Sequence, residues 1–130
     1  MTVTRQTTTA PTPEHDSERQ RYERIIDRYL DDCYATRSAA RGSEISHIIG
    51  AERTHLSVTV GRLFGKPLKA VLLEKQLAYA TRLLEVTDLP IDEIGPAAGF
   101  GSRNTFFRIF KRAFGMRPHQ YRVRAVGGGQ

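Results

Sequence analysis

The last third of the chain carries basic side chains without acidic ones. Between Gly101 and Arg124 there are seven Lys/Arg and no Asp or Glu: Arg103, Arg108, Lys111, Arg112, Arg117, Arg122 and Arg124. Seven acids instead gather between Glu14 and Thr36, so the net charge of +6 is concentrated in the C-terminal half. A basic field confined to one end is typical of a protein that binds a polyanion, nucleic acid above all.

The residue sets that other chemistries need are missing from the sequence. Cys33 is the only cysteine, which excludes an intrachain disulfide and a cysteine-rich zinc site. The four histidines, His15, His47, His55 and His119, have no metal-ligand spacing. We find no Ser/His/Asp set, phosphate-binding glycine loop or carboxylate pair tied to a recognisable site. The sequence therefore predicts a protein that is not an enzyme and uses no metal or cofactor.

Length and hydropathy set further bounds. The 130 residues, 39% of them hydrophobic, can form one ordinary domain or two very small ones. No stretch approaches the ~20 apolar residues of a membrane span, and the N-terminus lacks the apolar core of a signal peptide. We therefore expect a cytoplasmic protein with no membrane partner.

The basic segment is the second copy of an internal repeat. SEISHIIGAERTHLSVTVGRLFG, which begins at Ser43, aligns with DEIGPAAGFGSRNTFFRIFKRAFG, which begins at Asp92. The identical pairs are Glu44/Glu93, Ile45/Ile94, Gly50/Gly99, Arg62/Arg112, Phe64/Phe114 and Gly65/Gly115. Such self-similarity indicates one supersecondary unit built twice.

Each copy predicts a short helix, a glycine turn and a longer helix. The glycine of the turn suits a positive φ, which costs little only in that residue. Apolar residues then recur every fourth position and predict a buried face: Leu56, Val60 and Phe64 in one copy, Phe106, Phe110 and Phe114 in the other. Ser43 and Ser102 are expected N-caps, and Gly65 and Gly115 expected helix ends.

The rest of the chain supplies a linker, a first helix and two tails. Leu68 to Thr87 predicts a long helix, whose roughly 20 residues span about 30 Å, close to the ~34 Å of one DNA turn. An apolar stripe that includes Cys33 predicts another helix over Ser17 to Thr36. The expected domains are a disordered tail (1–16), a first helix-turn-helix subdomain (17–66), the linker helix (67–88), a second subdomain (89–124) and a flexible tail (125–130).

The outward face of each longer helix offers side chains suited to DNA. Arg forks onto guanine and Asn onto adenine, each good pair being worth roughly 1–3 kcal/mol of discrimination. In the second copy we expect base contacts from Arg103, Asn104 and Arg108, and phosphate contacts from Lys111, Arg112 and Arg117. The first copy is poorer, because it shows Arg53, Thr54, Ser57, Val58 and Arg62 beside the acidic Glu52.

The two motifs resemble the DNA-binding domain of the AraC/XylS family of bacterial transcription regulators. The family pattern is met in the second copy by Ile91, Ile94, Gly99, Phe100, Phe106, Phe110, Lys111, Phe114, Gly115, Pro118, Tyr121 and Arg122. The resemblance covers about Tyr22 to Arg122. It implies an all-α fold of about seven helices, with two helix-turn-helix subdomains joined by a long linker helix. It also implies that the third and sixth helices enter adjacent major grooves.

Carried over residue by residue, the resemblance puts base contacts at Thr54, Ser57 and Val58 in the third helix and at Arg103, Asn104 and Arg108 in the sixth. Phosphate contacts are expected from Arg53, Arg62, Lys111, Arg112 and Arg117. The chain departs from the family at Gly95, where alanine is usual, at Pro96, which can cost ~3 kcal/mol inside a helix, and at Val58, where a polar reader is common. We expect the short fifth helix to be kinked or irregular in its first turn.

The leading hypothesis is a sequence-specific regulator that binds double-stranded DNA as a monomer and contacts, or competes with, RNA polymerase. Two alternatives stay open. The chain could be a protein-interaction regulator whose first DNA-reading motif has decayed. It could also be the DNA-binding part of a longer, ligand-sensing regulator.

Overall fold

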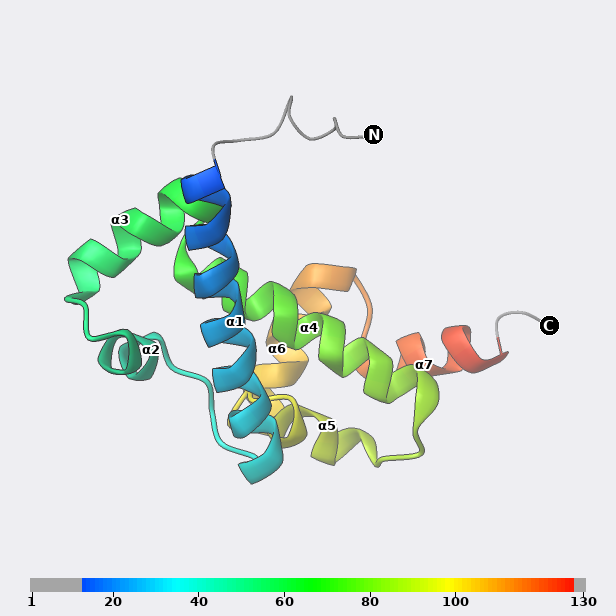
Figure 1. Cartoon of the computed structure of the whole chain (residues 1–130). Helices are drawn as coiled ribbons and strands as arrows, with labels where there is room; N and C mark the ends of the chain where they lie inside the picture. The colour runs from blue at the N-terminus through cyan, green and yellow to red at the C-terminus, as the bar shows by residue number, and fades with distance from the viewer. Residues whose placement is uncertain (1–12, 128–130) are drawn as a thin grey trace, which may run out of the picture.

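The computed structural model describes the backbone of residues 13–127 and the side chains of 17–125, and this part of the chain is built from seven helices without a strand (Figure 1). The helices are α1 (Pro13–Thr36), α2 (Gly42–Ile49), α3 (Arg53–Phe64), α4 (Leu68–Val86), α5 (Ile91–Ala97), α6 (Arg103–Phe114) and α7 (Pro118–Gly127). The predicted all-α fold is confirmed. None of these helices has the length and apolar character needed to cross a membrane.

Both ends of the described chain are more ordered than the sequence indicated. Helix α1 begins at Pro13, so residues 13–16 are helical although we expected them in a disordered tail. Helix α7 continues to Gly127 and takes up residues 125–127 of the expected C-terminal tail. The remainder of the two expected tails, 1–12 and 128–130, lies outside the described residues.

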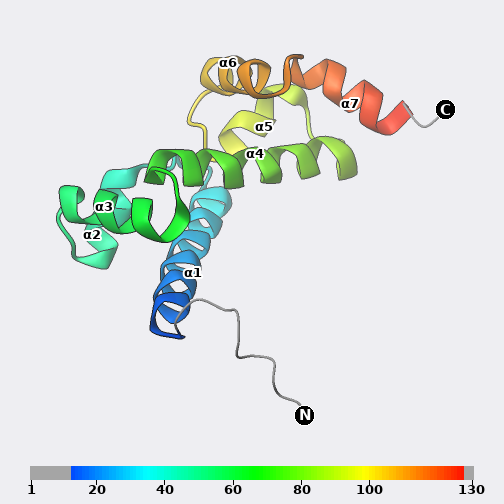
Figure 2. The same cartoon turned by 90° about the horizontal axis from the view of Figure 1, so that it is seen from above.

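Helix α4 is shared by two hydrophobic cores. Its first half contributes Val71 and Leu72 to a core with α1, α2 and α3. Its second half contributes Ala80 and Leu84 to a core with α5 and α6. Figure 2 shows α4 running between the α1–α3 and α5–α7 groups. The linker helix therefore fixes the subdomains by burial and is more than a spacer, since each half lies in one core.

The internal repeat is preserved in three dimensions. Helices α3 and α6 each contain 12 residues and end at Gly65 and Gly115, whose φ angles are 73° and 71°. The turn glycines Gly50 and Gly99 also have positive φ, 78° and 80°. These four predicted glycine positions are confirmed, because L side chains rarely adopt such angles.

One of the two predicted serine caps is wrong. Ser102 is confirmed, because its hydroxyl accepts the N–H of Thr105 at 3.1 Å. Ser43 instead lies inside α2, which begins after Arg41 without a side-chain cap of its own. The Tyr29 hydroxyl of α1 accepts the Arg41 N–H at 2.8 Å and donates to Glu44. A tertiary contact from α1 thus organises the start of α2, where we expected a local serine.

The predicted buried stripe also fails at its last position. Phe106 and Phe110 are fully buried, but Phe114 is 38% exposed, although its ring centre lies 4.5 Å from that of Phe110. The equivalent Phe64 is better covered, because the guanidinium of Arg19 in α1 lies 4.8 Å from its ring centre. Phe114 contacts Phe110 and Tyr121 of α7 but keeps part of its side chain exposed, so the stripe is not buried over its whole length.

Helix α5 is continuous from Ile91 to Ala97, with Pro96 as its second-to-last residue. The close packing around position 95 explains why the chain has glycine there instead of the alanine usual in the family. A Cβ at this position would lie 2.8 Å from the Phe106 Cβ and 3.0 Å from the Ser102 carbonyl oxygen. Helices α5 and α6 therefore approach so closely that only glycine fits between them.

Candidate nucleic-acid interface

The start of α6 presents the three side chains with the strongest potential for base contacts. Ser102 caps the helix, and Arg103 and Asn104 follow in its first turn, with Arg108 one turn later. All three candidates are exposed, whereas Phe106 and Phe110 on the other side of α6 are fully buried. The buried phenylalanines thus fix the helix while the basic and amide side chains remain accessible.

Arg103 is partly oriented by neighbours on the protein. Its Nε lies 3.3 Å from Oδ1 of Asp92 in α5, and its guanidinium carbon lies 5.3 Å from the centre of the Phe107 ring. Phe107 is half-buried and meets Phe106 edge-on. Because both charged side chains are more than half exposed, the ion pair is weak enough for Arg103 to exchange it for a base.

The outward face of α3 is less polar. Arg53, Thr54, Ser57 and Val58 are all exposed, and Val58 is 65% exposed, an unusual position for a valine without a partner. Glu52 occupies the N-cap position, but its side chain makes no capping hydrogen bond. Helix α3 therefore offers hydroxyl and methyl groups to a groove, with an acid at its start.

A groove of about 560 Å³ separates the two outward faces. Its lining comes from α3, from the first half of α4 and from α6, and includes Ser57 and Arg108, which are candidate base contacts. Arg53 and Arg112, two of the candidate phosphate contacts, also line it. The structure thus brings candidates from both motifs to the rims of one groove.

The other candidate phosphate contacts lie apart from the groove. Lys111 and Arg117 are exposed, and the backbone N–H of Arg117 donates to Oε1 of Gln120 at 2.9 Å. Arg62 pairs with Glu18 of α1 at 3.4 Å. The repeat equates Arg62 with Arg112, but their surroundings differ, because Arg62 pairs with an acid of α1 whereas Arg112 lines the groove.

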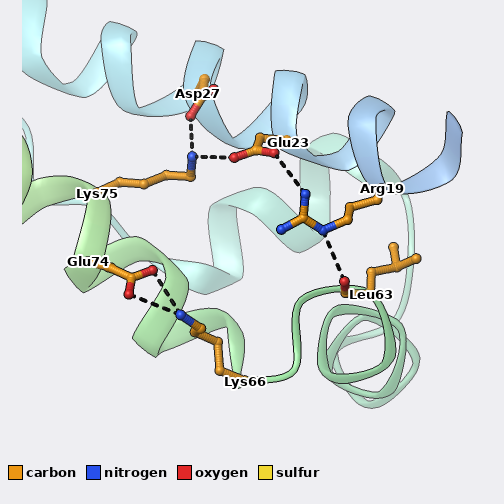
Figure 3. A network of polar contacts seen from close by, with 7 residues as sticks. All are labelled: Arg19, Glu23, Asp27, Leu63, Lys66, Glu74 and Lys75. Carbon is orange, nitrogen blue, oxygen red and sulfur yellow. Dashed lines mark hydrogen bonds and ion pairs between the residues drawn. The ribbon is translucent and has the colours of Figure 1, made fainter. Parts of the chain in front are cut away.

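Acidic side chains of α1 neutralise cations on the flank of α4 (Figure 3). The ammonium group of Lys75 lies 2.9 Å from both Glu23 and Asp27. The hydrogen bond from Lys75 lowers the pKa of Glu23 below its ordinary value. Cys33 lies nearby in the core, where burial raises the pKa of its thiol. The ammonium group of Lys75 on this flank is thus held by internal ion pairs, and the buried thiol of Cys33 is unreactive.

A buried polar seam that the sequence analysis missed joins the subdomains. Gln76 of α4 is 4% exposed and donates to the carbonyl oxygens of Ala98 and Gly99 at 3.1 and 2.7 Å. The Ala40 N–H donates to the same Gly99 oxygen at 2.9 Å. A glutamine inside the leucine-rich run of the linker was the one available signal, since buried polar side chains are hydrogen-bonded.

Aromatic and charged contacts extend this seam. The rings of Tyr34 in α1 and Tyr79 in α4 are stacked, with centres 4.0 Å apart and planes at 7°. Burial raises the pKa of Tyr34 above its ordinary value. Arg37, just after α1, pairs with Glu93 of α5 at 3.5 Å. The first subdomain thus touches α5 directly, which fixes α6 relative to α3.

Two tandem helix-turn-helix motifs that share a central helix and expose the second helix of each motif define a bipartite DNA-binding domain. Residues 45–124 match a family model described as a helix-turn-helix domain. The chain belongs to the AraC/XylS family of DNA-binding transcription regulators, as the sequence predicted. Members of this family are regulators and not enzymes.

Similar curated proteins are bacterial regulators. The chain is 34% identical over 74 residues to the F1 operon positive regulatory protein of Yersinia pestis, covering 57% of this chain and 25% of that protein. It is 28% identical over 92 residues to the xylose operon regulatory protein of Escherichia coli K12, covering 68% and 24%. The chain thus spans about a quarter of the length of these relatives.

Similar solved structures share the fold. The C-terminal domain of the response regulator yesN from Fusobacterium nucleatum superposes with a TM-score of 0.72 at 27% identity, covering 82% of this chain and 98% of that one. The DNA-binding domain of AdpA, solved in complex with a target DNA, gives 0.70 at 23% identity, with 80% and 93% covered. The described helices therefore form the complete fold of such a domain.

Proposed function

We propose that this chain regulates transcription by binding double-stranded DNA through α3 and α6, which enter two adjacent major-groove segments. The observation that carries the proposal is the pair of exposed faces on these helices, which meet at the rims of one groove. Both helices are fixed by buried side chains, so that their outward residues keep a defined register toward a duplex.

The two faces have different tasks in this proposal. Arg103, Asn104 and Arg108 of α6 read base edges, each bidentate pair contributing roughly 1–3 kcal/mol of discrimination. Thr54 and Val58 of α3 contact thymine methyl groups, and the hydroxyl groups of Thr54 and Ser57 hydrogen-bond to base edges. This half of the operator therefore tolerates more substitutions. The phosphate contacts are Arg53, Arg62, Lys111, Arg112 and Arg117, which position the chain without specifying sequence.

The chain binds DNA as a monomer in this proposal, because one copy already carries both recognition helices. The proposed place of action is the cytoplasm. We propose RNA polymerase as its protein partner, and activation as the outcome. The names of the F1 operon positive regulatory protein and of the transcriptional activator VirF, also from Yersinia, support activation.

Selection of bound sequences from random duplexes tests the proposal. The parent is expected to enrich a bipartite site, and Arg103→Ala and Arg108→Ala to relax it in the half that α6 reads. Arg82→Ala is the matched control, because Arg82 is equally exposed on α4 but does not line the groove. Failure of the parent to enrich any sequence would overturn the proposal and favour the protein-interaction alternative. Enrichment of a single half-site would restrict base reading to α6.

A further inference from the structure

We propose that the groove between α3 and α6 receives the DNA backbone that joins the two major-groove segments, and that Lys69 of α4 contacts a phosphate there. This inference rests on the proposed function, because it concerns the middle of the same DNA site. Lys69 belongs to neither recognition helix.

The charged side chains that line the groove are all basic. Leu72, Leu73 and Gln76 of α4 contribute to it between the walls formed by α3 and α6. Four cations also line it, Arg53, Lys69, Arg108 and Arg112, and no lining residue is an acid. A concave surface with one sign of charge focuses the field and attracts an anionic ligand.

Lys69 differs from the two neighbouring lysines, Lys66 just before α4 and Lys75 within it, because both of those form ion pairs. Lys66 is held by both carboxylate oxygens of Glu74 at 2.9 and 3.0 Å, and Lys75 by Glu23 and Asp27 (Figure 3). Lys69 is exposed and forms no ion pair with any carboxylate of residues 17–125. The same holds for Arg53 and Arg112 within this range. Their charges are therefore available to an external anion.

The geometry of DNA indicates which part of the duplex lies in the groove between α3 and α6. Successive major-groove segments on one face of a duplex are about 34 Å apart, and a minor groove flanked by two phosphate backbones lies between them. Helix α4, with 19 residues, is about 28 Å long at ~1.5 Å per residue, which matches this spacing. A duplex placed on both recognition faces must therefore pass its central phosphates over the groove.

The salt dependence of binding measures this contact. On the duplex enriched by the parent, Lys69→Gln should make the negative slope of log K against log salt shallower by about 0.9, the value for one lost phosphate contact. The same substitution should weaken binding to the enriched duplex and binding to a scrambled duplex by the same factor, because a phosphate contact carries no sequence information. Lys69→Arg should keep the parental slope. Lys66→Gln is the matched control, and its slope should also stay parental because Glu74 already neutralises Lys66.

Neutral methylphosphonate links at the central phosphates provide a second test. They should weaken binding of the parent several-fold and add little to the loss already caused by Lys69→Gln. Any of three results would overturn the inference. The first is the same salt slope for Lys69→Gln and the parent, and the second is the same loss of affinity for Lys69→Gln and Lys66→Gln. The third is full additivity between Lys69→Gln and the methylphosphonate links. In each of those cases the parent still enriches its site, so the proposed function stands. Only failure of the parent to enrich a sequence would count against that function.

Discussion

The side-chain amide of Gln76 donates to the carbonyl oxygens of both Ala98 and Gly99, at 3.1 and 2.7 Å, from a site that is 4% exposed. Gly99 is the turn residue between α5 and α6, and α4 is part of both cores. The bond therefore connects the shared helix to the turn that orients the second recognition helix. This hydrogen bond fixes the position of the second motif relative to the first more directly than the length of the linker helix does.

Gln76→Leu should destabilise the protein by about 1–3 kcal/mol, because it removes the side-chain donor to the Ala98 oxygen and leaves the Gly99 oxygen with only the Ala40 N–H. Urea unfolding gives the change in the free energy of unfolding. Gln20→Leu is the control, since Gln20 is exposed on α1, and its effect should stay within about 0.5 kcal/mol. A stability equal to that of the parent would contradict the structural role of the bond. In DNA selection, the Gln76 variant should accept altered spacing between the two half-sites.

Gly95→Ala and Gly61→Ala should have opposite effects. A Cβ at Gly95 would lie 2.8 Å from the Phe106 Cβ, so overpacking should cost about 1–3 kcal/mol. A Cβ at Gly61 in α3 would meet no atom within 4 Å. Alanine there should stabilise the protein by up to about 1 kcal/mol through helix propensity. Thermal unfolding of both variants checks the pair, and a shift in the same direction would refute the close approach of α5 and α6.

Asp92→Asn should strengthen DNA binding by about two- to five-fold, the size expected from an exposed ion pair. The change releases Arg103 from Asp92, 3.3 Å away, and removes a negative charge near the phosphates. Asp88→Asn makes the same change in net charge at an exposed residue outside the ion pairs of the described chain. A titration of labelled duplex should show a smaller gain for that control. Weaker binding by Asp92→Asn would mean that the carboxylate orients Arg103 for reading.

The pairing of Glu23 with Lys75 should make stability depend on pH. The pKa of Glu23 is lowered in the folded protein, first by the hydrogen bond from Lys75. Its stabilising contribution is therefore complete above the unfolded pKa, and it disappears as pH falls through the lower pKa of the folded protein. The stability difference between the parent and Glu23→Gln should shrink over this window, from no more than about 1 kcal/mol for a partly exposed pair. Asp32→Asn serves as the control, and a difference that is constant with pH would disprove the assignment.

Local signals in the sequence were reliable wherever a residue type alone decides the conformation. The glycines at 50, 65, 99 and 115 adopt the positive φ expected of them, and Ser102 caps α6 as predicted. Predictions failed where a distant element intervened. The Tyr29 hydroxyl of α1 accepts the N–H at the start of α2, where Ser43 was the expected cap. Phe114 contacts Phe110 and Tyr121 of α7 but stays partly exposed.

The sequence likewise predicted one part of the candidate interface and not another. Apolar spacing in α3 and α6 was enough to predict which face is buried, so the exposed positions of Arg103, Asn104 and Arg108 followed from the sequence. The repeat alone could not distinguish Arg62 from Arg112. Only the first is paired with an acid of α1, and only the second lines the groove.

The sequence by itself determined the faces of the two recognition helices and their glycine turns, because helical periodicity and glycine conformation are local properties. The family, and with it the seven-helix all-α class, followed from the resemblance of its motifs. The tertiary structure alone decided how the motifs are held together and which cations remain unpaired. Gln76 meets Gly99, and Lys66 but not Lys69 meets an acid, only after the chain has folded. Such contacts depend on the packing of separate helices, which a spacing pattern along the chain does not encode.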